Sequence, residues 1–323
     1  MRAAVHTRYG TPDVVSIREV EDPVPLANEV LVRIHATTVN RTDCAYRAAK
    51  PFIARFLTGL TRPRVTIMGT EFAGVVEAVG DGVSTFEIGD RVFGYSEGRF
   101  GCHAELLTIP EDGSIATIPA NLTFVEAAPG TEGAHYALAF IRRARIHEGQ
   151  TVLVNGATGA IGSAAVQLLK GIGANVTAVC ATAHLGLVSR LGADRVIDYT
   201  NEDFTLGERK YDVVLDAVGK SSFGRCRRLL NPRGLYSSSE PGRFWQNPVL
   251  ALVTALLPVK TVVFPIPTDN QAIVQHLRDL IESGTFKPVI DRHYRLDQIV
   301  EAYRYVESGR KVGNVVIEVA PPP

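Results

Sequence analysis

The sequence predicts a mixed α/β protein in which a β-rich domain precedes a doubly wound parallel sheet. Its 323 residues are about twice the usual length of one domain. Up to about Thr123, short β-type runs are separated by Gly, Pro and Asp turn signals. From Thr151 onward, apolar strands alternate with helical segments, a pattern typical of a parallel sheet covered on both faces.

Composition excludes several classes of protein. Hydrophobic residues make up 46% of the chain and charged residues 21%, which excludes disorder, collagen and coiled coil. The 34 basic and 34 acidic residues cancel, so no net field favours nucleic acid as a partner. Four scattered cysteines without a C-x-x-C pair argue against a disulfide framework and for a reducing, cytoplasmic location. We expect no export signal and no transmembrane span, because the most apolar run, Pro248–Pro258, is well below about twenty residues.

The first domain is expected to form a partly open β-barrel or sandwich. Its clearest strands are Glu29–His35, Ala73–Val79 and Arg91–Tyr95. From Val125 to Ile146 the apolar residues take helical spacing, with Pro129 and Gly130 near the start, which predicts a helix that links the two domains.

The second domain is expected to alternate strands and helices. Strands are predicted at Thr151–Val154, Asn175–Val179, Arg195–Asp198, Tyr211–Asp216 and Gly234–Ser238, and helices at Ala160–Gly171, His184–Leu191 and Ser221–Leu230. Beyond Pro267, two helices, Gln271–Ser283 and Gln298–Ser308, precede a last strand, Gly313–Val319. We expect this final piece to return to the first domain, which divides the chain into residues 1–123, 124–266 and 267–323.

A phosphate-binding turn is predicted in Val152–Lys170, VLVNGATGAIGSAAVQLLK. A strand leads directly into Gly156, Gly159 and Gly162, and a helix follows. Glycines at such a turn permit the tight bend, the approach of backbone N–H groups to a pyrophosphate and close packing of helix on strand. The spacing is G-x-x-G-x-x-G, with Ala157 where the standard pattern has Gly. We expect a dinucleotide here; the alternative left open is a purely structural turn.

Cofactor choice is predicted from the segment after the next strand. An acid at this place would hold the ribose hydroxyls of NAD, but Val179–His184 contains none. Thr182, His184 and Arg190 are candidate donors to a 2′-phosphate. NADP(H) is therefore favoured, with NAD(H) as the alternative, and His184 is alternatively a solvated residue of a first helical turn.

With this turn in mid-chain after a β-rich domain, the sequence resembles the medium-chain dehydrogenase/reductase superfamily, most closely its zinc-independent, zeta-crystallin-like quinone oxidoreductase branch. The resemblance rests on the turn segment and on VNRTD, MGTEFAGVVEAVG, GDRVFG, LGADRVIDYTNEDF, YDVVLDAVGK and GRKVGNVVI. It implies a GroES-like β-barrel catalytic domain, a Rossmann nucleotide-binding domain and a homodimer.

The same resemblance implies that no catalytic zinc is held. Where zinc relatives carry a Cys and a His ligand, this chain has Asn40 and Thr70, and no Cys lies between Val125 and Leu138. A catalytic zinc site needs three protein ligands and an open position. The structural-zinc lobe is missing too, because Cys102 is the only cysteine between Phe93 and Leu122. Glu71 is expected to form structural hydrogen bonds.

By the same resemblance, the catalytic candidates are Asn40, Asp43 and Tyr46. Asn40 is expected to donate a hydrogen bond to the substrate carbonyl, the alternative being a capped turn after the preceding strand. Asp43 is expected near the nicotinamide ribose. Tyr46, shifted by one position from the tyrosine of close relatives, is either a proton donor or stacking wall, or a packing residue.

Cofactor contacts are carried over in the same way. The pyrophosphate is expected on Thr158, Gly159, Ala160 and Ile161, within the turn from Gly156 to Gly162. Tyr199 is expected beside the adenosine phosphate or in ordinary packing. Ala217 and Val218 are expected to wall the ribose, and Asn314 to approach the nicotinamide. The apolar stretch 244–267 is expected as a lid, a dimer contact through Thr261–Phe264, a membrane-surface flap or plain core packing.

The expected function is zinc-independent hydride transfer from NADPH to a quinone or an α,β-unsaturated carbonyl. Such a reaction needs orientation, a dry cleft and donors to the developing oxyanion rather than a Lewis acid. Two alternatives remain open. One is a zinc-free NAD(P)-dependent alcohol/ketone oxidoreductase, and the other is a non-catalytic protein that senses nucleotides.

Overall fold

The computed structural model describes residues 1–50, 52, 55–96, 98–242, 245–255, 260–265 and 270–320. The chain divides into two compact units. The first unit comprises Met1–Glu132, Asp269–Ser283 and Pro288–Pro323, and the second comprises Gly133–Thr268 and Gly284–Lys287. The polypeptide therefore leaves the first unit and later returns to it.

The second unit contains a six-stranded parallel sheet with the order β10-β9-β8-β11-β12-β13. Its strands are β8 (Thr151–Asn155), β9 (Asn175–Cys180), β10 (Arg195–Asp198), β11 (Tyr211–Asp216), β12 (Leu230–Ser238) and β13 (Thr261–Val263). The chain starts at the centre, builds to one edge, crosses back and builds to the other, which is the 3-2-1-4-5-6 order of a doubly wound sheet. The predicted fold class is confirmed.

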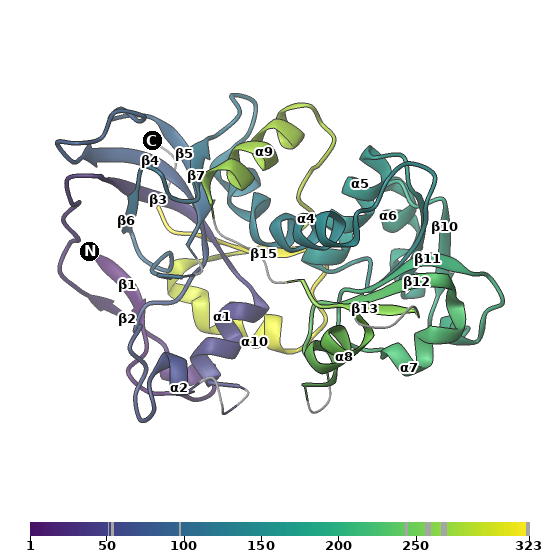
Figure 1. The fold of residues 1–323 in the computed structure, drawn as a ribbon. Coiled ribbons are helices and arrows are strands. Elements are labelled where there is room, and N and C mark those ends of the chain that lie inside the picture. Colours follow the sequence, from purple (N-terminus) through teal and green to yellow (C-terminus); the bar gives the residue numbers. More distant parts are fainter. Residues whose placement is uncertain are drawn as a thin grey trace. The chain divides into compact units, whose positions relative to one another are not determined.

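Helices cover both faces of this sheet. Helices α5 (Ala160–Gly171) and α6 (Leu185–Arg190) lie on one face, and α7 (Phe223–Cys226) and α8 (Gln246–Ala255) on the other (Figure 1). Within the described residues, the connections include the 3-10 turns η4 (Thr182–His184), η5 (Phe204–Leu206) and η6 (Arg227–Leu229). Because apolar side chains meet helices on both sides, the strands β8, β9 and β11 are almost continuously buried.

The first unit is built on a largely antiparallel seven-stranded sheet that branches at one long strand. Strand β3 (Glu29–Val39) pairs with β4 (Glu71–Val79) on one side. On its other side the first half of β3 pairs with β6 (Leu106–Pro110) and the second half with β15 (Asn314–Glu318). The remaining strands are β5 (Arg91–Tyr95), β7 (Ile115–Thr117) and β14 (Ile290–Arg295), and β1 (Arg2–Val5) and β2 (Ser16–Glu19) form a separate pair.

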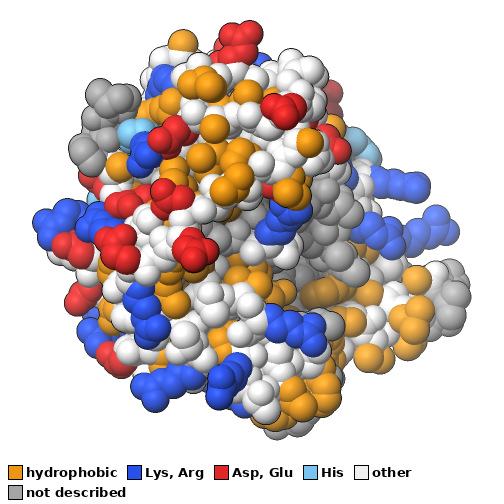
Figure 2. Space-filling view, turned by 90° about the vertical axis from the view of Figure 1, so that its left-hand side faces the viewer, with side chains coloured by type: hydrophobic (Ala, Val, Ile, Leu, Met, Phe, Trp, Pro, Cys, Tyr) orange, Lys and Arg blue, Asp and Glu red, His pale blue; other side chains and the backbone are white. Residues whose placement is uncertain are grey.

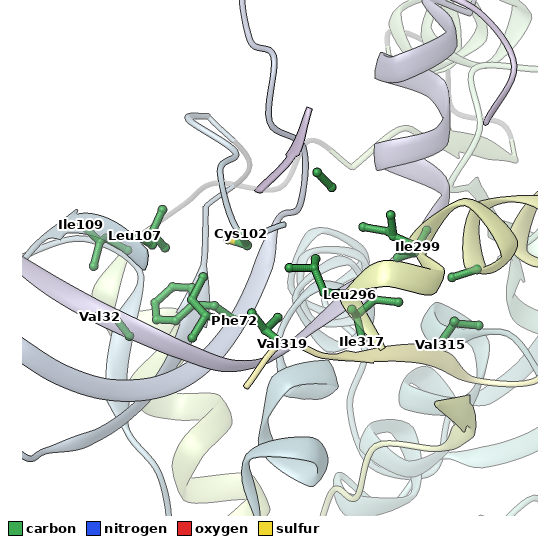
Figure 3. Close-up of a cluster of buried hydrophobic side chains, with 14 of the residues drawn as sticks. Val32, Phe72, Cys102, Leu107, Ile109, Leu296, Ile299, Val315, Ile317 and Val319 are labelled. Atoms are coloured by element: carbon green, nitrogen blue, oxygen red, sulfur yellow. The ribbon is translucent and has the colours of Figure 1, made fainter. Parts of the chain in front are cut away.

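The core of the first unit draws on both ends of the chain. Figure 3 shows Val32 and Phe72 of β3 and β4 in one cluster with Val315 and Ile317 of β15. Leu296 of η8 (Leu296–Gln298) and Ile299 of α10 (Ile299–Glu307) close this cluster from the helical side. The C-terminal segment thus supplies core residues that the N-terminal strands need.

One predicted helix, at the passage from the first unit to the second, needs correction. The predicted continuous helix from Val125 to Ile146 is wrong: α3 (Phe124–Ala127) passes into η3 (Ala128–Gly130), and α4 (Glu132–Ala144) starts afresh. Pro129 lacks the N–H that an unbroken helix would require there. The first unit also contains the helical elements η1 (Pro12–Val14), α1 (Arg41–Ala48), α2 (Arg55–Thr58) and α9 (Gln271–Glu282).

The surface carries charges of both signs. Figure 2 shows acidic and basic side chains on the same face, among apolar ones. None of the helices in the described ranges is both long and apolar enough to cross a bilayer. Within the apolar stretch 244–267, the structure describes α8 and β13, while residues 244, 256–259 and 266–267 lie outside the described residues.

We predict that Leu153→Ala destabilises the second unit by about 2–5 kcal/mol, because it leaves a cavity at the centre of the sheet. Leu153 is completely buried on β8. Leu206→Ala is the matched control, since Leu206 is 63% exposed in the same unit and its truncation should cost less than about 0.5 kcal/mol. Guanidinium unfolding of both variants measures the difference. Equal midpoints would contradict the central position of β8.

Candidate functional site

The glycine turn joins β8 to α5 and is anchored on the neighbouring strand. Gly156 adopts a φ of +80°, and the amides of Gly156 and Ala157 donate to the carbonyl of Val179 at 3.2 and 3.1 Å. Gly159 caps α5, and the first helical bond runs from Ser163 N to Gly159 O at 2.8 Å. The amides of residues 160–162 therefore precede the helical ladder, as an anion site at a helix N-terminus requires.

Two glycines of this turn have no room for a side chain. A Cβ on Gly162 would lie 2.1 Å from the carbonyl oxygen of Gly156, and a Cβ on Gly156 would lie 2.3 Å from Val218 Cγ1. At Gly159 the nearest atom would be 3.7 Å away. Ala157 is fully buried, so its methyl group packs inward where the standard pattern has Gly. Thr158, Ala160 and Ile161 are partly exposed.

A buried carboxylate shapes the ribose wall predicted at Ala217 and Val218. Asp216 ends β11 and accepts bonds from the amides of Val218 at 3.3 Å, Lys220 at 3.4 Å and Ser221 at 2.7 Å. The side-chain amide of Asn155 donates to the same carboxylate at 3.0 Å. Ala217 N donates to Asn155 O at 3.0 Å, which ties this turn to the end of β8. Sequence reasoning missed Asp216, although an acid that closes an apolar strand was a visible signal.

The predicted adenosine contacts meet at the carboxyl ends of β9 and β10. Thr182 lies in η4, half-buried His184 ends that turn, and Tyr199, 57% exposed, is held by a bond from its amide to Cys180 O at 3.1 Å. Asp198, which sequence reasoning missed, accepts from Thr182 Oγ1 at 2.6 Å. The segment after β9 contains no acid, but Asp198 at the end of β10 lies beside Thr182 of that segment.

In the first unit, Asn40 caps helix α1. Its Oδ1 accepts from Asp43 N at 2.9 Å, while Asp43 Oδ2 accepts from Asn40 N at 3.0 Å, so the two residues form a reciprocal capping box. Asn40 Nδ2 donates to Thr70 Oγ1 at 2.7 Å. The two positions that carry ligands in zinc relatives are thus joined by a hydrogen bond. Within the described residues, the second Nδ2 hydrogen remains available to a further acceptor.

Asp43 is fully buried and links α1 to the sheet. Its Oδ1 accepts from Gly69 N at 3.0 Å, and its Oδ2 lies 3.8 Å from His103 Nε2. His103 is bonded to Thr38 O at 2.8 Å and to Tyr303 OH at 3.2 Å. Burial lowers the pKa of His103 to about 4, so the imidazole is neutral near pH 7. These contacts position Asp43 rigidly behind Asn40.

Tyr46 and Asn314 make other contacts within the first unit. Tyr46 is half-buried on α1, with its ring 4.8 Å from that of Phe100. Asn314 Nδ2 donates to Val289 O at 3.0 Å. The pairing of Val315 with Val39 places Asn314 and Asn40 at the same end of neighbouring strands.

Glu71 is buried beside the start of α4 and accepts several hydrogen bonds. Its carboxylate accepts from Thr38 Oγ1 at 2.6 Å, from Thr131 Oγ1 and N at 2.9 and 3.1 Å, and from Glu132 N at 2.6 Å. Burial raises the pKa of Glu71, and these donors oppose that rise. The carboxylate therefore holds β3, β4 and the start of α4 together.

No group of three or more His, Cys, Asp or Glu side chains within the described ranges is placed to hold a metal ion. The predicted residues gather at two places. Asn40 and Asp43 meet at the start of α1. The predicted cofactor-binding residues of the second unit lie around the glycine turn and at the ends of β9 to β11.

Comparison with known families matches both units. The model described as "Alcohol dehydrogenase GroES-like domain" matches residues 26–120, and the model described as "Zinc-binding dehydrogenase" matches residues 191–317. The first match covers most strands of the first unit, and the second runs from β10 to all but the last residue of β15.

Individual relatives align over almost the whole chain. A 2-methylene-furan-3-one reductase of Solanum lycopersicum is 32% identical over 99% of this chain and 80% of its own length. The chloroplastic NADPH-dependent alkenal/one oxidoreductase of Arabidopsis thaliana is 31% identical over the same shares. The solved quinone oxidoreductase of Coxiella burnetii superposes with a TM-score of 0.89 at 25% identity, with 99% of each chain covered.

We predict that Gly159→Ala and Gly162→Ala separate nucleotide binding from folding. Gly159 has ordinary φ and space for a Cβ, so its variant should keep the unfolding midpoint while the new methyl weakens dinucleotide binding at least tenfold by crowding the amides. Gly162→Ala should lower the midpoint, because its Cβ would overlap the Gly156 carbonyl. Calorimetric titration and denaturant unfolding measure the two effects. Unchanged binding in Gly159→Ala would show that no pyrophosphate approaches this turn.

Proposed function

Because this chain belongs to the medium-chain dehydrogenase/reductase superfamily, in its quinone oxidoreductase branch, it is an oxidoreductase, and we propose that it reduces quinones or α,β-unsaturated carbonyls with NADPH and without zinc. The observation that carries the proposal is the hydrogen bond between Asn40 and Thr70. These residues occupy the two positions at which zinc-dependent relatives are expected to carry metal ligands, and they provide an amide and a hydroxyl instead. Relatives named for enone, alkenal and quinone reduction support the acceptor class.

The glycine turn fits a dinucleotide, since Gly156 and Gly162 exclude side chains and the first amides of α5 precede its ladder. Residues 156–162 would hold the pyrophosphate, and Ala217 and Val218 the ribose wall. When bound, NADPH supplies the hydride and leaves as NADP⁺. The proton that completes the reduction is assigned to water.

In the first unit, Asn40 is assigned to the substrate carbonyl. The capping box fixes its backbone, and the bond to Thr70 fixes its amide plane, so the remaining Nδ2 hydrogen is oriented before substrate arrives. A preorganised donor of this kind stabilises a developing oxyanion without reorganisation. Asp43 is assigned as a positioning residue, because its carboxylate is occupied by the amides of Asn40 and Gly69.

We also propose the larger organisation. Residues 1–123 and 267–323 form the catalytic domain, and residues 124–266 the nucleotide-binding domain. A homodimer would form through β13, which ends the order of the six-stranded sheet and so presents a strand edge. Four buried free cysteines support a cytoplasmic location.

An acceptor panel tests the reaction class. We predict that NADPH oxidation, followed at its absorbance maximum, is stimulated by a quinone, an enal and an enone but not by a simple saturated ketone. Turnover of the ketone alone would favour an alcohol/ketone oxidoreductase. Cofactor binding without turnover of any acceptor would favour a nucleotide sensor. Stoichiometric zinc in protein purified without added metal would contradict the metal-free mechanism.

Asn40→Ser and Asn40→Ala separate capping from catalysis. Serine caps a helix about as well as asparagine, so Asn40→Ser should change the free energy of unfolding little, whereas Asn40→Ala should lose about 1 kcal/mol. Both variants lack the amide donor, and we predict that both lose about 100-fold in kcat. The dissociation constant of NADPH should stay the same. Full activity of Asn40→Ser would leave Asn40 with a structural role only.

A further inference from the structure

The phosphate that distinguishes NADPH from NADH sits on the adenosine ribose, which in sheets of this order lies beyond the carboxyl end of the second strand. Here that strand is β9, which ends at Cys180, and Thr182 follows in η4. We propose that Asp198 sets the cofactor preference of this chain, its carboxylate opposing the 2′-phosphate so that NADH is accepted alongside NADPH. This inference rests on the proposed nucleotide site of the second unit.

The register of the sheet brings Asp198 to this place. β10 runs parallel to β9, and Asp198 pairs with Cys180, so both strands end at the same level. Asp198 Oδ2 then lies 2.6 Å from Thr182 Oγ1, which in turn lies 2.7 Å from Thr200 Oγ1. The hydroxyl hydrogen of Thr182 is donated to Asp198. A 2′-phosphate that approached Thr182 would meet an oxygen whose hydrogen is already committed.

Local hydrogen bonds keep this carboxylate charged. Thr200 donates to Asp198 Oδ1 through its amide at 2.9 Å and its hydroxyl at 2.7 Å, and Asn201 Nδ2 donates to Oδ2 at 2.8 Å. The bonds from Thr182 and Thr200 lower the pKa of Asp198. The carboxylate is therefore an anion throughout the physiological range.

No arginine or lysine offsets this charge at ion-pair distance in the part of the chain that the structure describes. Arg190 was the cation predicted for the 2′-phosphate, but its Nη1 lies only 3.5 Å from the Cβ position of Gly186, so its guanidinium runs back along α6. Half-buried His184 is the other candidate. The charge nearest to Thr182 is thus negative.

The consequence is selective for one cofactor. NADH presents a neutral 2′-hydroxyl to this place, and a carboxylate can accept a hydrogen bond from it. NADPH presents a phosphate that carries nearly two negative charges. Removing one unit of like charge beside such a group in a partly solvated site improves binding by about tenfold.

Calorimetric titration with NADPH and NADH tests this inference. Asp198→Asn keeps the size and an acceptor oxygen while it removes the charge, so it should tighten NADPH binding about tenfold and leave NADH binding within about twofold. Glu208→Gln is the matched control, because it removes an exposed carboxylate before β11 in the same unit and should change neither constant. The wild-type chain should bind NADPH no more than about tenfold more tightly than NADH.

The outcomes are distinguishable. An unchanged NADPH-to-NADH ratio in Asp198→Asn, or an equal change in Glu208→Gln, would overturn the role of Asp198 while the proposed reductase function stands. A wild-type preference for NADPH well above tenfold would overturn it even where the variant does not fold. Wild-type chain that binds neither nucleotide would instead overturn the proposed function.

Discussion

The structure depends on one constraint, that backbone amides left over in turns and at helix starts must find acceptors inside the protein. Three fully buried carboxylates are examples. Asp43 accepts from the amides of Asn40 and Gly69, Glu71 from those of Thr131 and Glu132, and Asp216 from those of Val218, Lys220 and Ser221. A hydrogen bond from a backbone amide to a carboxylate is stronger than one to a neutral acceptor, so these turns have fixed shapes. The candidate site of each unit contains such turns.

The same constraint explains which residues remain available for chemistry. Asp43 and Glu71 resemble catalytic acids by residue type, but their oxygens are occupied by donors of their own unit. Asn40 differs because an amide nitrogen has two hydrogens, and Thr70 takes one of them. A residue that caps a helix and keeps a spare donor is held in place by the fold that it helps to form. This is why an amide, and not a carboxylate, is the reasonable partner for a substrate carbonyl here.

Local sequence predicted most elements of the second unit because their signals are local, but the predicted helix Ser221–Leu230 is wrong: the chain forms α7 and η6 there, and β12 already begins at Leu230. The helix Ala160–Gly171 and the strands Arg195–Asp198 and Tyr211–Asp216 have the predicted bounds, since short apolar runs between turn residues carry their own boundaries. β14 was not predicted, because its sequence IDRHYR is polar and its side chains are mostly exposed. Helix α1 was missed because its start is defined by the reciprocal capping of Asn40 and Asp43, a contact more easily seen in three dimensions.

The adenosine end shows why site chemistry is harder to predict than fold. The segment that follows β9 in the sequence has no acid, and this absence by itself favours a cofactor with a 2′-phosphate. Reading across the sheet, the pairing of Asp198 with Cys180 brings a carboxylate to Thr182 from sixteen residues away in sequence. Parallel strands align their carboxyl ends, so the last residue of each strand contributes to one shared surface. The charge of a nucleotide site is therefore a property of the sheet edge as a whole. In this chain the turn after β9 supplies the hydroxyl of Thr182, and the end of β10 supplies the negative charge of Asp198.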